Sequence, residues 1–124
     1  MRLLLDTHAA IWWLSDDPRL GAGAAAQLED DSNHVLLSAV VVWEVAVKRS
    51  LGKLDTPDGF ASRLLRAGVV ALSVSIEHAA GVELLPHHHR DPFDRLLISQ
   101  AIIEKATIVS SDDKLRAYDV PVLW

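Results

Sequence analysis

Short apolar runs alternate along the chain with longer segments in which apolar residues recur at helical spacing. The apolar runs have the length of strands and are expected at residues 2–5, 34–37, 69–72, 106–109 and 121–124. The helical segments are expected at residues 8–14, 22–30, 39–51, 58–67, 76–84 and 92–105, with a short one at 113–118. Strands that alternate with helices are typical of a parallel sheet covered on both faces. The pattern therefore predicts an α/β fold with a parallel five-stranded sheet.

The segment at residues 39–51 is ambiguous, because its valines favour a strand. Three features favour a helix instead. Ser38 is a suitable N-cap, the apolar periodicity runs on to Leu51, and Gly52 stands where a helix would end. We therefore expect a helix here.

Length and composition fit one folded domain that spans residues 1–124. Half of the residues are apolar and 23% are charged, which argues against a disordered chain. Because the chain has no cysteine, any metal must be held by carboxylate or imidazole groups. The apolar runs are too short to cross a membrane, and Asp6 interrupts the first of them where a signal peptide would continue, so we expect a cytoplasmic protein.

Two acidic residues follow predicted strands. Asp6 comes directly after the first strand and Asp112 shortly after the fourth, so both are expected at the carboxyl edge of the sheet, where open α/β folds bind ligands. A carboxylate in this position also commonly caps the next helix. Each residue can therefore be either a cap or part of a site.

Two further acids lie within the apolar stripes of predicted helices. Glu44 and Asp94 share their helix faces with apolar residues one turn away, so both are expected to point inward. The alternatives are an exposed pair of Glu44 with Lys48, and a first-turn position for Asp94 after an Asp91 cap and Pro92.

Together these four acids require positive charge. A buried carboxylate costs several kcal/mol unless it is paired or binds a metal, and the neighbouring Lys48 and Arg95 are too few to neutralise all four. All-oxygen sites select hard cations, so Mg²⁺ or Mn²⁺ is expected. Such a metal can promote phosphodiester hydrolysis. It would also supply local positive charge to a chain whose net charge of −5 argues against simple electrostatic adhesion to nucleic acid.

Other polar and aromatic residues have less specific interpretations. The adjacent histidines His87, His88 and His89 are expected at the surface, without a direct role in metal binding. Arg95 is expected either to contact a phosphate or an active-site acid, or to form a structural salt bridge. The tryptophans Trp12, Trp13, Trp43 and Trp124 suit base stacking, although aromatic residues in apolar patterns more often belong to a core or a subunit interface.

Four segments, "LLLDTHAAIWWL", "SAVVVWEVAVKRSLGKL", "HRDPFDRLLISQA" and "IVSSDDKL", resemble the successive motifs of PIN-domain ribonucleases, and among them the VapC-type toxins of bacterial toxin-antitoxin pairs. The resemblance extends over essentially the whole chain. It implies that the acidic site, which would be both catalytic and metal-binding, consists of Asp6, Glu44, Asp94 and Asp112. Asp113 remains an alternative to its neighbour Asp112.

The resemblance also implies a PIN-like three-layer α/β/α sandwich and a metal-dependent endoribonuclease that acts as a growth-inhibiting toxin. The substrate would be RNA, one or two Mg²⁺ or Mn²⁺ ions would be bound, and a cognate antitoxin would block the acidic pocket of a homodimer. Water, rather than a side chain, is the expected nucleophile.

Two alternatives to a toxin remain. The first keeps the PIN fold in a nuclease for RNA processing or for structured DNA, or in a binding protein without turnover. The second is a phosphoacceptor receiver domain, which is also small, acidic and Mg²⁺-binding. A receiver would require paired acids after the first strand and a lysine after the last one, whereas here Asp6 stands alone and the chain stops at Trp124.

Overall fold

The computed structural model describes residues 1–124 and contains one parallel sheet. The strands are β1 (Arg2–Leu5), β2 (His34–Ser38), β3 (Val70–Leu72), β4 (Thr107–Val109) and β5 (Val122–Leu123). Their order in the sheet is β3-β2-β1-β4-β5, and every neighbouring pair is parallel. The predicted five-stranded parallel sheet is thus confirmed.

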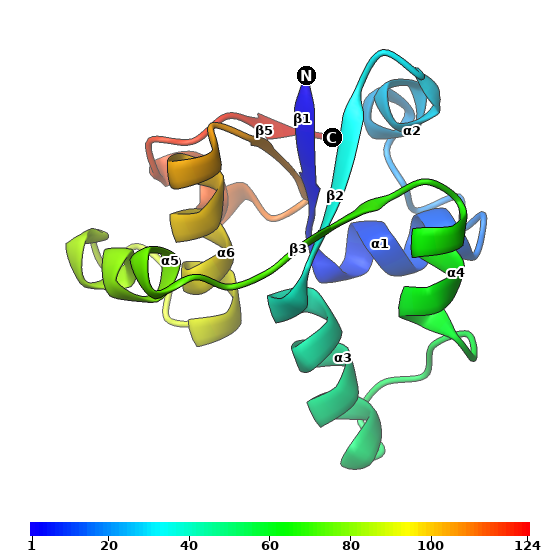
Figure 1. Ribbon diagram of the computed structural model, residues 1–124, viewed down its shortest axis with the longest axis horizontal. Coiled ribbons are helices and arrows are strands. Elements are labelled where there is room, and N and C mark those ends of the chain that lie inside the picture. The colour runs from blue at the N-terminus through cyan, green and yellow to red at the C-terminus, as the bar shows by residue number, and fades with distance from the viewer.

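The helices are α1 (Thr7–Leu14), α2 (Ala22–Glu29), α3 (Ala39–Ser50), α4 (Phe60–Arg66), α5 (Ile76–Gly81) and α6 (Pro92–Glu104), with short 3₁₀ helices η1 (Val82–Leu84) and η2 (Asp113–Ala117). Helices α5 and α6 lie to one side of the strands, and α1, α2 and α4 lie to the other (Figure 1). This arrangement is the predicted α/β/α sandwich.

Two predicted helices differ in detail from the structure. The helix expected at 76–84 ends at Gly81 and continues as η1. A side-chain carbon at Gly81 would come within 2.6 Å of the Ser99 hydroxyl oxygen on α6, so the chain packs closely against α6 at this point. The helix expected at 58–67 begins only at Phe60, because Gly59 adopts a left-handed conformation with φ of +68°.

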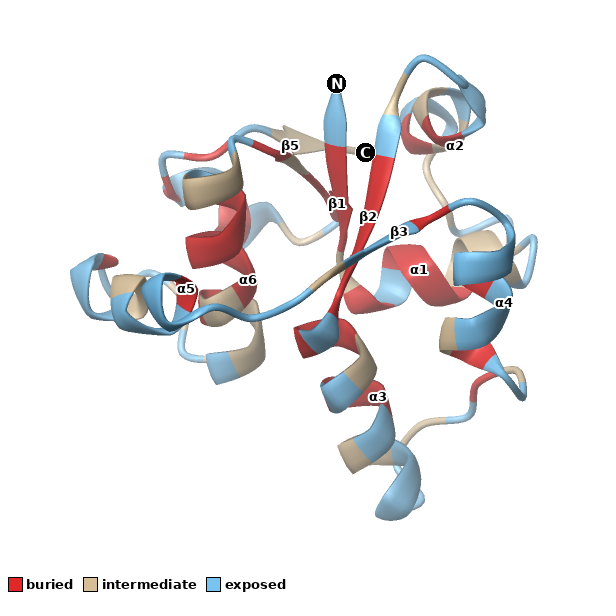
Figure 2. Cartoon of the chain, viewed as in Figure 1, coloured by how far each residue is buried: buried red, intermediate tan, exposed pale blue.

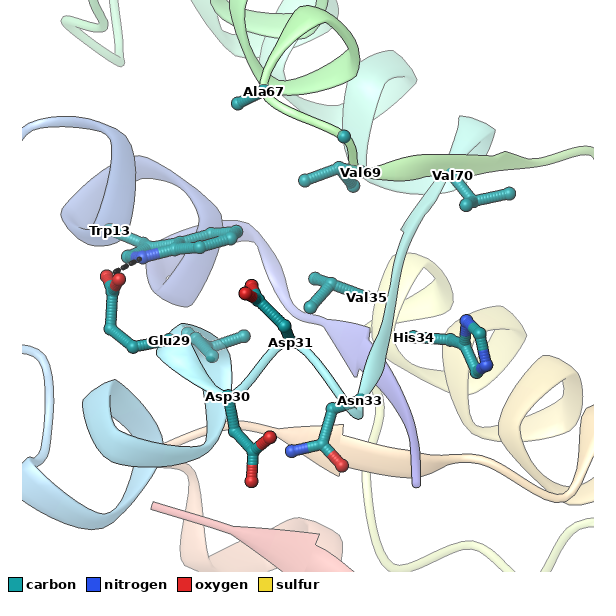
Figure 3. Close-up of a pocket in the computed structure, with 12 residues that line it drawn as sticks. Trp13, Glu29, Asp30, Asp31, Asn33, His34, Val35, Ala67, Val69 and Val70 are labelled. Carbon is teal, nitrogen blue, oxygen red and sulfur yellow. Dashed lines mark hydrogen bonds between the residues drawn. The ribbon is translucent and has the colours of Figure 1, made fainter.

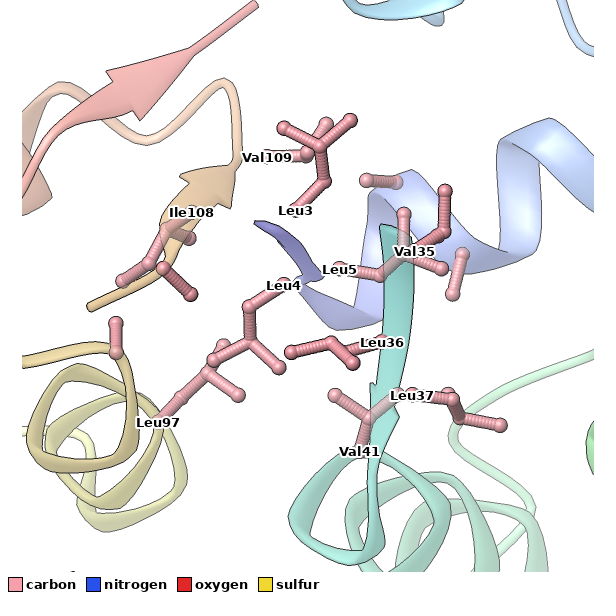
Figure 4. Packing of buried hydrophobic residues seen from close by; sticks show 14 of the residues in the cluster. Leu3, Leu4, Leu5, Val35, Leu36, Leu37, Val41, Leu97, Ile108 and Val109 are labelled. Atoms are coloured by element: carbon pink, nitrogen blue, oxygen red, sulfur yellow. The ribbon is translucent and has the colours of Figure 1, made fainter. Parts of the chain in front are cut away.

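The core is built around the central strand. Leu3, Leu4 and Leu5 of β1 are fully buried, and because side chains alternate along a strand, they must be covered on both faces of the sheet. Figure 4 shows Leu97 of α6 and Leu36 of β2 in the same packed cluster. Burial follows the middle of the sheet, and the outer turns of the helices are exposed (Figure 2).

Helix α3 begins directly at the end of β2. The Ser38 hydroxyl accepts a hydrogen bond from the backbone N–H of Val40 at 3.0 Å, which confirms the predicted N-cap. Gly52 lies just beyond the helix with φ of +68°, where a residue without a side chain is favoured. The ambiguous valine-rich segment is therefore a helix, and Glu44 lies within its second turn.

The sheet order reverses next to β1, which lies between β2 and β4. Open α/β sheets bind ligands at the carboxyl ends of strands at such a reversal. The backbone N–H of Asp6 donates to the carbonyl oxygen of Val109 at 3.1 Å, so the ends of β1 and β4 are held together. None of the helices has the length and apolar character that a membrane span requires.

Candidate metal centre

Asp6 caps a helix and also lies close enough to another acid to feel its charge. Its carboxylate caps α1 by accepting a hydrogen bond from the backbone N–H of Ala9 at 2.8 Å. The side chain of Ser110, which follows β4, lies close enough to lower the pKa of Asp6. Burial, as the main cause, raises the pKa of Asp6 above its ordinary value, and the nearby charge of Glu44 raises it further. The cap therefore also belongs to a group of acids.

Asp112 is held at the same edge of the sheet. Its carboxylate accepts from the backbone N–H of Lys114 at 3.0 Å, and its own N–H donates to the Ser110 hydroxyl at 3.0 Å. The side chain of Asp113, by contrast, is 97% exposed and pairs with Arg116. Of the two neighbouring acids, the structure brings Asp112 to the site.

Glu44 is buried, as the helical pattern predicted, and it also pairs with Lys48. The Thr7 hydroxyl donates to one carboxylate oxygen at 2.6 Å, and the Lys48 ammonium donates to the other. The hydrogen bond to Glu44, together with the charges of nearby acids, raises the pKa of Lys48. Glu44 is therefore both buried and paired with Lys48, because its carboxylate lies inside the protein while the Lys48 side chain is partly exposed.

Asp94 lies in the first turn of α6. Asp91 caps this helix by accepting from the backbone N–H groups of Phe93 and Asp94, and Pro92 occupies the first helical position. The Asp94 side chain is 27% exposed, so it turns only partly inward. The cap arrangement fixes the direction in which the Asp94 carboxylate enters the site.

His89 joins Asp94 to Asp112. Its Nε2 lies 3.1 Å from a carboxylate oxygen of Asp94 and 2.9 Å from one of Asp112, and the side chain is only 10% exposed. Its Nδ1 accepts from the backbone N–H of Asp91 at 3.1 Å, so Nε2 carries the hydrogen that faces the two carboxylates. The prediction of a surface position is wrong for His89, whereas His87 and His88 are exposed.

Arg95 explains why His89 reaches the site. Its guanidinium is buried and donates to the carbonyl oxygens of Pro86 and His89 and to the Tyr118 hydroxyl, at 2.9, 3.4 and 3.3 Å. It also donates to the carbonyl oxygens of two earlier residues of the same segment. Arg95 forms neither the expected salt bridge nor a contact with the acids, so those two interpretations were wrong. A contact of Arg95 with a phosphate stays a prediction. Arg95 shapes the loop that carries His89.

The carboxylates affect one another electrostatically. The pKa of Asp94 is raised to about 7, chiefly by burial and then by the like charges of Asp91, Glu44 and Asp6, while His89 lowers it. Partial burial raises the pKa of Asp112, but the hydrogen bonds from His89 and from a backbone N–H outweigh it and lower the pKa below its ordinary value. The acids therefore form one coupled group.

The donor set fits a hard divalent cation. Ligand atoms of His89, Asp94 and Asp112 all lie within 4.8 Å of one another, and Glu44 and Asp6 act on Asp94 through their charges. Carboxylate oxygens are the ligands that Mg²⁺ and Mn²⁺ prefer, and a divalent cation would relieve the repulsion that raises the pKa of Asp94. In this arrangement the hydrogen on Nε2 keeps His89 from being a ligand, so it holds the ligands instead.

The raised pKa of Asp94 predicts how metal-free stability depends on pH. Because the folded protein binds this proton more tightly than the unfolded chain, the free energy of unfolding should fall as pH rises from about 4 to about 7, by at most about 1.4 kcal/mol per unit. Asp94→Asn removes this loss. In EDTA, the variant should match the wild type near pH 4 and melt at a higher temperature at pH 8. A constant difference between the two proteins across this range would contradict the assignment.

His89 should contribute to metal binding through the acids that it orients. His89→Ala is expected to weaken Mn²⁺ binding about tenfold to a hundredfold, as loss of a group that orients metal ligands commonly does. Isothermal titration with Mn²⁺ measures this effect, and the matched control is His87→Ala, which changes an exposed residue of the same loop. Equal affinities for the two variants would show that His89 has no such role.

A second pocket lies away from this centre. It has a volume of about 390 Å³ and lies at the amino ends of β2 and β3, where Trp13, Asp31 and Val69 line it (Figure 3). Its acid Glu29 accepts a hydrogen bond from the Trp13 indole at 3.3 Å. Because it faces the opposite edge of the sheet from Asp6 and Asp112, it takes no part in the acidic centre.

The four tryptophans have different surroundings. Trp12, Trp13 and Trp124 are partly buried and pack against the core, as most aromatic residues in apolar patterns do. Trp43 is instead 55% exposed, and its ring makes an edge-on contact with Phe93, with 4.7 Å between the ring centroids.

Fold and site together define an α/β domain with an acidic centre at the carboxyl edge of a parallel sheet. The sequence model of the family described as "PIN domain" matches residues 3–121. The chain therefore belongs to the PIN domain family, and the receiver-domain alternative is excluded.

Two curated relatives come from Mycobacterium tuberculosis. Ribonuclease VapC16 is 42% identical over 71 residues, which cover 51% of this chain and 50% of that protein. Ribonuclease VapC22 is 29% identical over 122 residues, which cover 96% of this chain and 93% of that protein. The match thus spans half the length of the first relative and nearly all of the second.

Solved structures share the fold at low sequence identity. A chain in the crystal structure of VapBC2 from Rickettsia felis, bound to a DNA fragment from its promoter, superimposes with a TM-score of 0.73 at 18% identity, covering 98% of this chain and 97% of that one. A chain of FitAcB from Neisseria gonorrhoeae gives a TM-score of 0.64 at 21% identity, with coverage of 97% and 95%. These likenesses support the PIN fold.

Proposed function

We propose that this protein is a metal-dependent endoribonuclease that acts as a growth-inhibiting toxin. The observation that carries the proposal is the gathering of acids at one edge of the sheet: Asp94 lies with Asp112 around His89, and burial together with the charges of Asp91, Glu44 and Asp6 raises its pKa to about 7. The ribonuclease names of both curated relatives support RNA as the substrate.

The acids Asp6, Glu44, Asp94 and Asp112 would hold the metal. A bound Mg²⁺ or Mn²⁺ supplies a Lewis acid for the scissile phosphate and positive charge for the leaving oxygen. The positive charge of the metal would also attract the RNA phosphates to a protein whose net charge of −5 would otherwise repel them. No cysteine, serine or lysine nucleophile is needed.

The surrounding residues position this centre. The Thr7 hydroxyl donates to one oxygen of Glu44, and the Ser110 hydroxyl accepts from the backbone N–H of Asp112. With a pKa of about 7, Asp94 is partly protonated near neutral pH, and it would have to be ionised to hold a cation. Activity should therefore fall in mild acid, where protons compete with the cation.

The partners of the relatives suggest how such an enzyme is controlled. Several structures with this fold are named as toxin-antitoxin or VapBC assemblies, among them one from Klebsiella pneumoniae. We infer that a cognate antitoxin binds this chain and blocks the acidic pocket, that the chain forms a homodimer, and that residues 1–124 act as one domain. The expected site of action is the cytoplasm, where RNA is present.

Induced expression in a bacterial host tests the toxin role. Wild-type protein should arrest growth and produce new internal RNA ends, whereas Asp6→Asn, made to the same level, should do neither. New RNA ends without growth arrest would favour the alternative of a PIN nuclease in RNA processing. Growth arrest without new ends, or equal arrest by both proteins, would refute the ribonuclease proposal.

A further inference from the structure

An aromatic pair of one exposed and one half-buried ring stands next to two of the acids in the sequence. Trp43 directly precedes Glu44 on α3, and Phe93 directly precedes Asp94 on α6. The two rings meet at an interplanar angle of 65°, with their centroids 4.7 Å apart. The pair therefore joins α3 and α6, at the residues that precede Glu44 and Asp94 in the sequence.

The Trp43 ring remains available to a ligand. In an edge-on pair, neither ring covers both faces of the other, and Trp43 is 55% exposed. The other three tryptophans pack against the core, so Trp43 is the one whose ring is open to a ligand. Lys48, one turn after Glu44 on α3, places an ammonium group beside that acid, so Glu44 has an aromatic neighbour in the sequence and a cationic partner in space.

We propose that Trp43, braced by Phe93, stacks on an unpaired nucleobase of the RNA next to the phosphate that is cut. This inference rests on the proposed ribonuclease function and assigns Trp43 as a residue that positions its substrate. A base within a duplex is already stacked on both sides, so only an unpaired base can pack on the indole. The enzyme should therefore cut single-stranded RNA in preference to the same sequence in a duplex.

Stacking also suits the charge of the protein. With a net charge of −5, the chain has no overall excess of positive charge for the phosphate contacts that dominate binding by basic proteins. Stacking on an aromatic ring needs no positive charge and tolerates any base. The aromatic pair would thus supply affinity that the overall charge of the surface does not.

A protein partner is the competing occupant of this surface. Trp43 also lines an apolar groove of about 400 Å³ between α3, α4 and β3, together with Val42, Leu65 and Leu72. Phe93 is not part of that groove, so the aromatic pair extends from the groove toward Asp94. The contact with Phe93 favours a ligand that reaches the acids, as a nucleotide at the cut site must.

Kinetics on defined RNAs test this inference. Cleavage of one RNA sequence, as a single strand and as a duplex, is measured with Mn²⁺ for the wild type, Trp43→Ala, Trp43→Phe and Leu84→Ala. Leu84 is a matched control, because it is an apolar residue that is 86% exposed and lies on η1, away from the acids. Melting curves verify that every variant is folded.

The expected results separate stacking from other roles. Trp43→Ala should lower kcat/KM on the single strand about tenfold to a hundredfold and remove the preference over the duplex, while Trp43→Phe retains most of both. Leu84→Ala should match the wild type. If Trp43→Ala cleaves the single strand as well as the wild type does, the nucleobase platform is refuted and the ribonuclease function stands.

Two further measurements cover the remaining outcomes. If the wild type cleaves neither RNA, anisotropy of a labelled single-stranded RNA decides the matter: weaker binding by Trp43→Ala supports the platform without the nuclease, and equal or absent binding refutes it. Light scattering gives the mass of each variant. If Trp43→Ala and Trp43→Phe both lose activity in step with a loss of self-association, Trp43 belongs to a subunit interface and the platform is refuted.

Discussion

Asp6→Asn is expected to reduce RNA cleavage by roughly a hundredfold to several thousandfold, which corresponds to the loss of several kcal/mol of transition-state stabilisation. The amide keeps the shape of the side chain but removes the charge that holds the metal. The fold should survive, because asparagine caps helices as well as aspartate does and can still accept from the Ala9 N–H. A time course of RNA cleavage with Mn²⁺ measures the effect, and circular dichroism verifies the fold.

Asp112 and Asp113 provide a matched pair of controls for this assignment. Asp112→Asn should reduce cleavage as strongly as Asp6→Asn, while Asp113→Asn changes a side chain that is 97% exposed and should leave the rate within about twofold. If Asp6→Asn retains more than roughly a third of wild-type activity, a loss of under 1 kcal/mol, the assignment of Asp6 is wrong. If Asp113→Asn is the damaging change, the metal centre lies elsewhere on η2.

Divalent cations should stabilise the protein strongly. A cation that binds only the folded form adds about 2.7 kcal/mol at a hundredfold excess over its dissociation constant, which corresponds to roughly 10 °C in melting temperature for a domain of this size. The gain arises because the cation relieves the repulsion among the acids that raises the pKa of Asp94. Thermal scans in EDTA and in millimolar Mg²⁺ or Mn²⁺ measure it.

The quadruple variant Asp6→Asn, Glu44→Gln, Asp94→Asn and Asp112→Asn is the control for this stabilisation. It should lose the metal response, and its metal-free form should melt at a higher temperature than the metal-free wild type at pH 8. Removing the charges removes both the ligands and their repulsion. An equal metal shift in the two proteins would show that the cation binds at another place.

The sheet could be predicted from the sequence because parallel strands that are buried on both faces consist of continuous apolar residues. Leu3, Leu4 and Leu5 are fully buried, and no polar residue interrupts them. The helix at 39–51 was predicted correctly despite its valines, since Ser38 and Gly52 mark its ends through local backbone chemistry. Features that depend on neighbouring residues alone were thus accessible from the sequence.

The position of His89 was not accessible in this way. It depends on the course of a loop, which the buried Arg95 guanidinium fixes through the carbonyl oxygens of Pro86 and His89 and through the distant Tyr118 hydroxyl. Nothing in the spacing of adjacent histidines indicates which of them turns inward. An arginine within the apolar stripe of α6 was the available signal, because a buried guanidinium needs several acceptors.

The dual roles of the acids have a similar origin. Sequence reasoning treated capping and metal binding as alternatives for Asp6 and Asp112, yet each carboxylate has two oxygens and can do both. The pair of Glu44 with Lys48 was likewise not an alternative to burial. A cap holds a carboxylate in a fixed direction, which favours its use in a site.

The most direct test of the central claim is cleavage of a purified RNA by the purified protein, with the RNA ends mapped, in EDTA and across a titration of Mn²⁺. Cleavage at internal positions should appear only with the metal, and the quadruple variant of Asp6, Glu44, Asp94 and Asp112 should show none at any concentration. Cleavage that persists in EDTA, or that the quadruple variant performs at the wild-type rate, would contradict the assignment of a metal-dependent ribonuclease to these four acids.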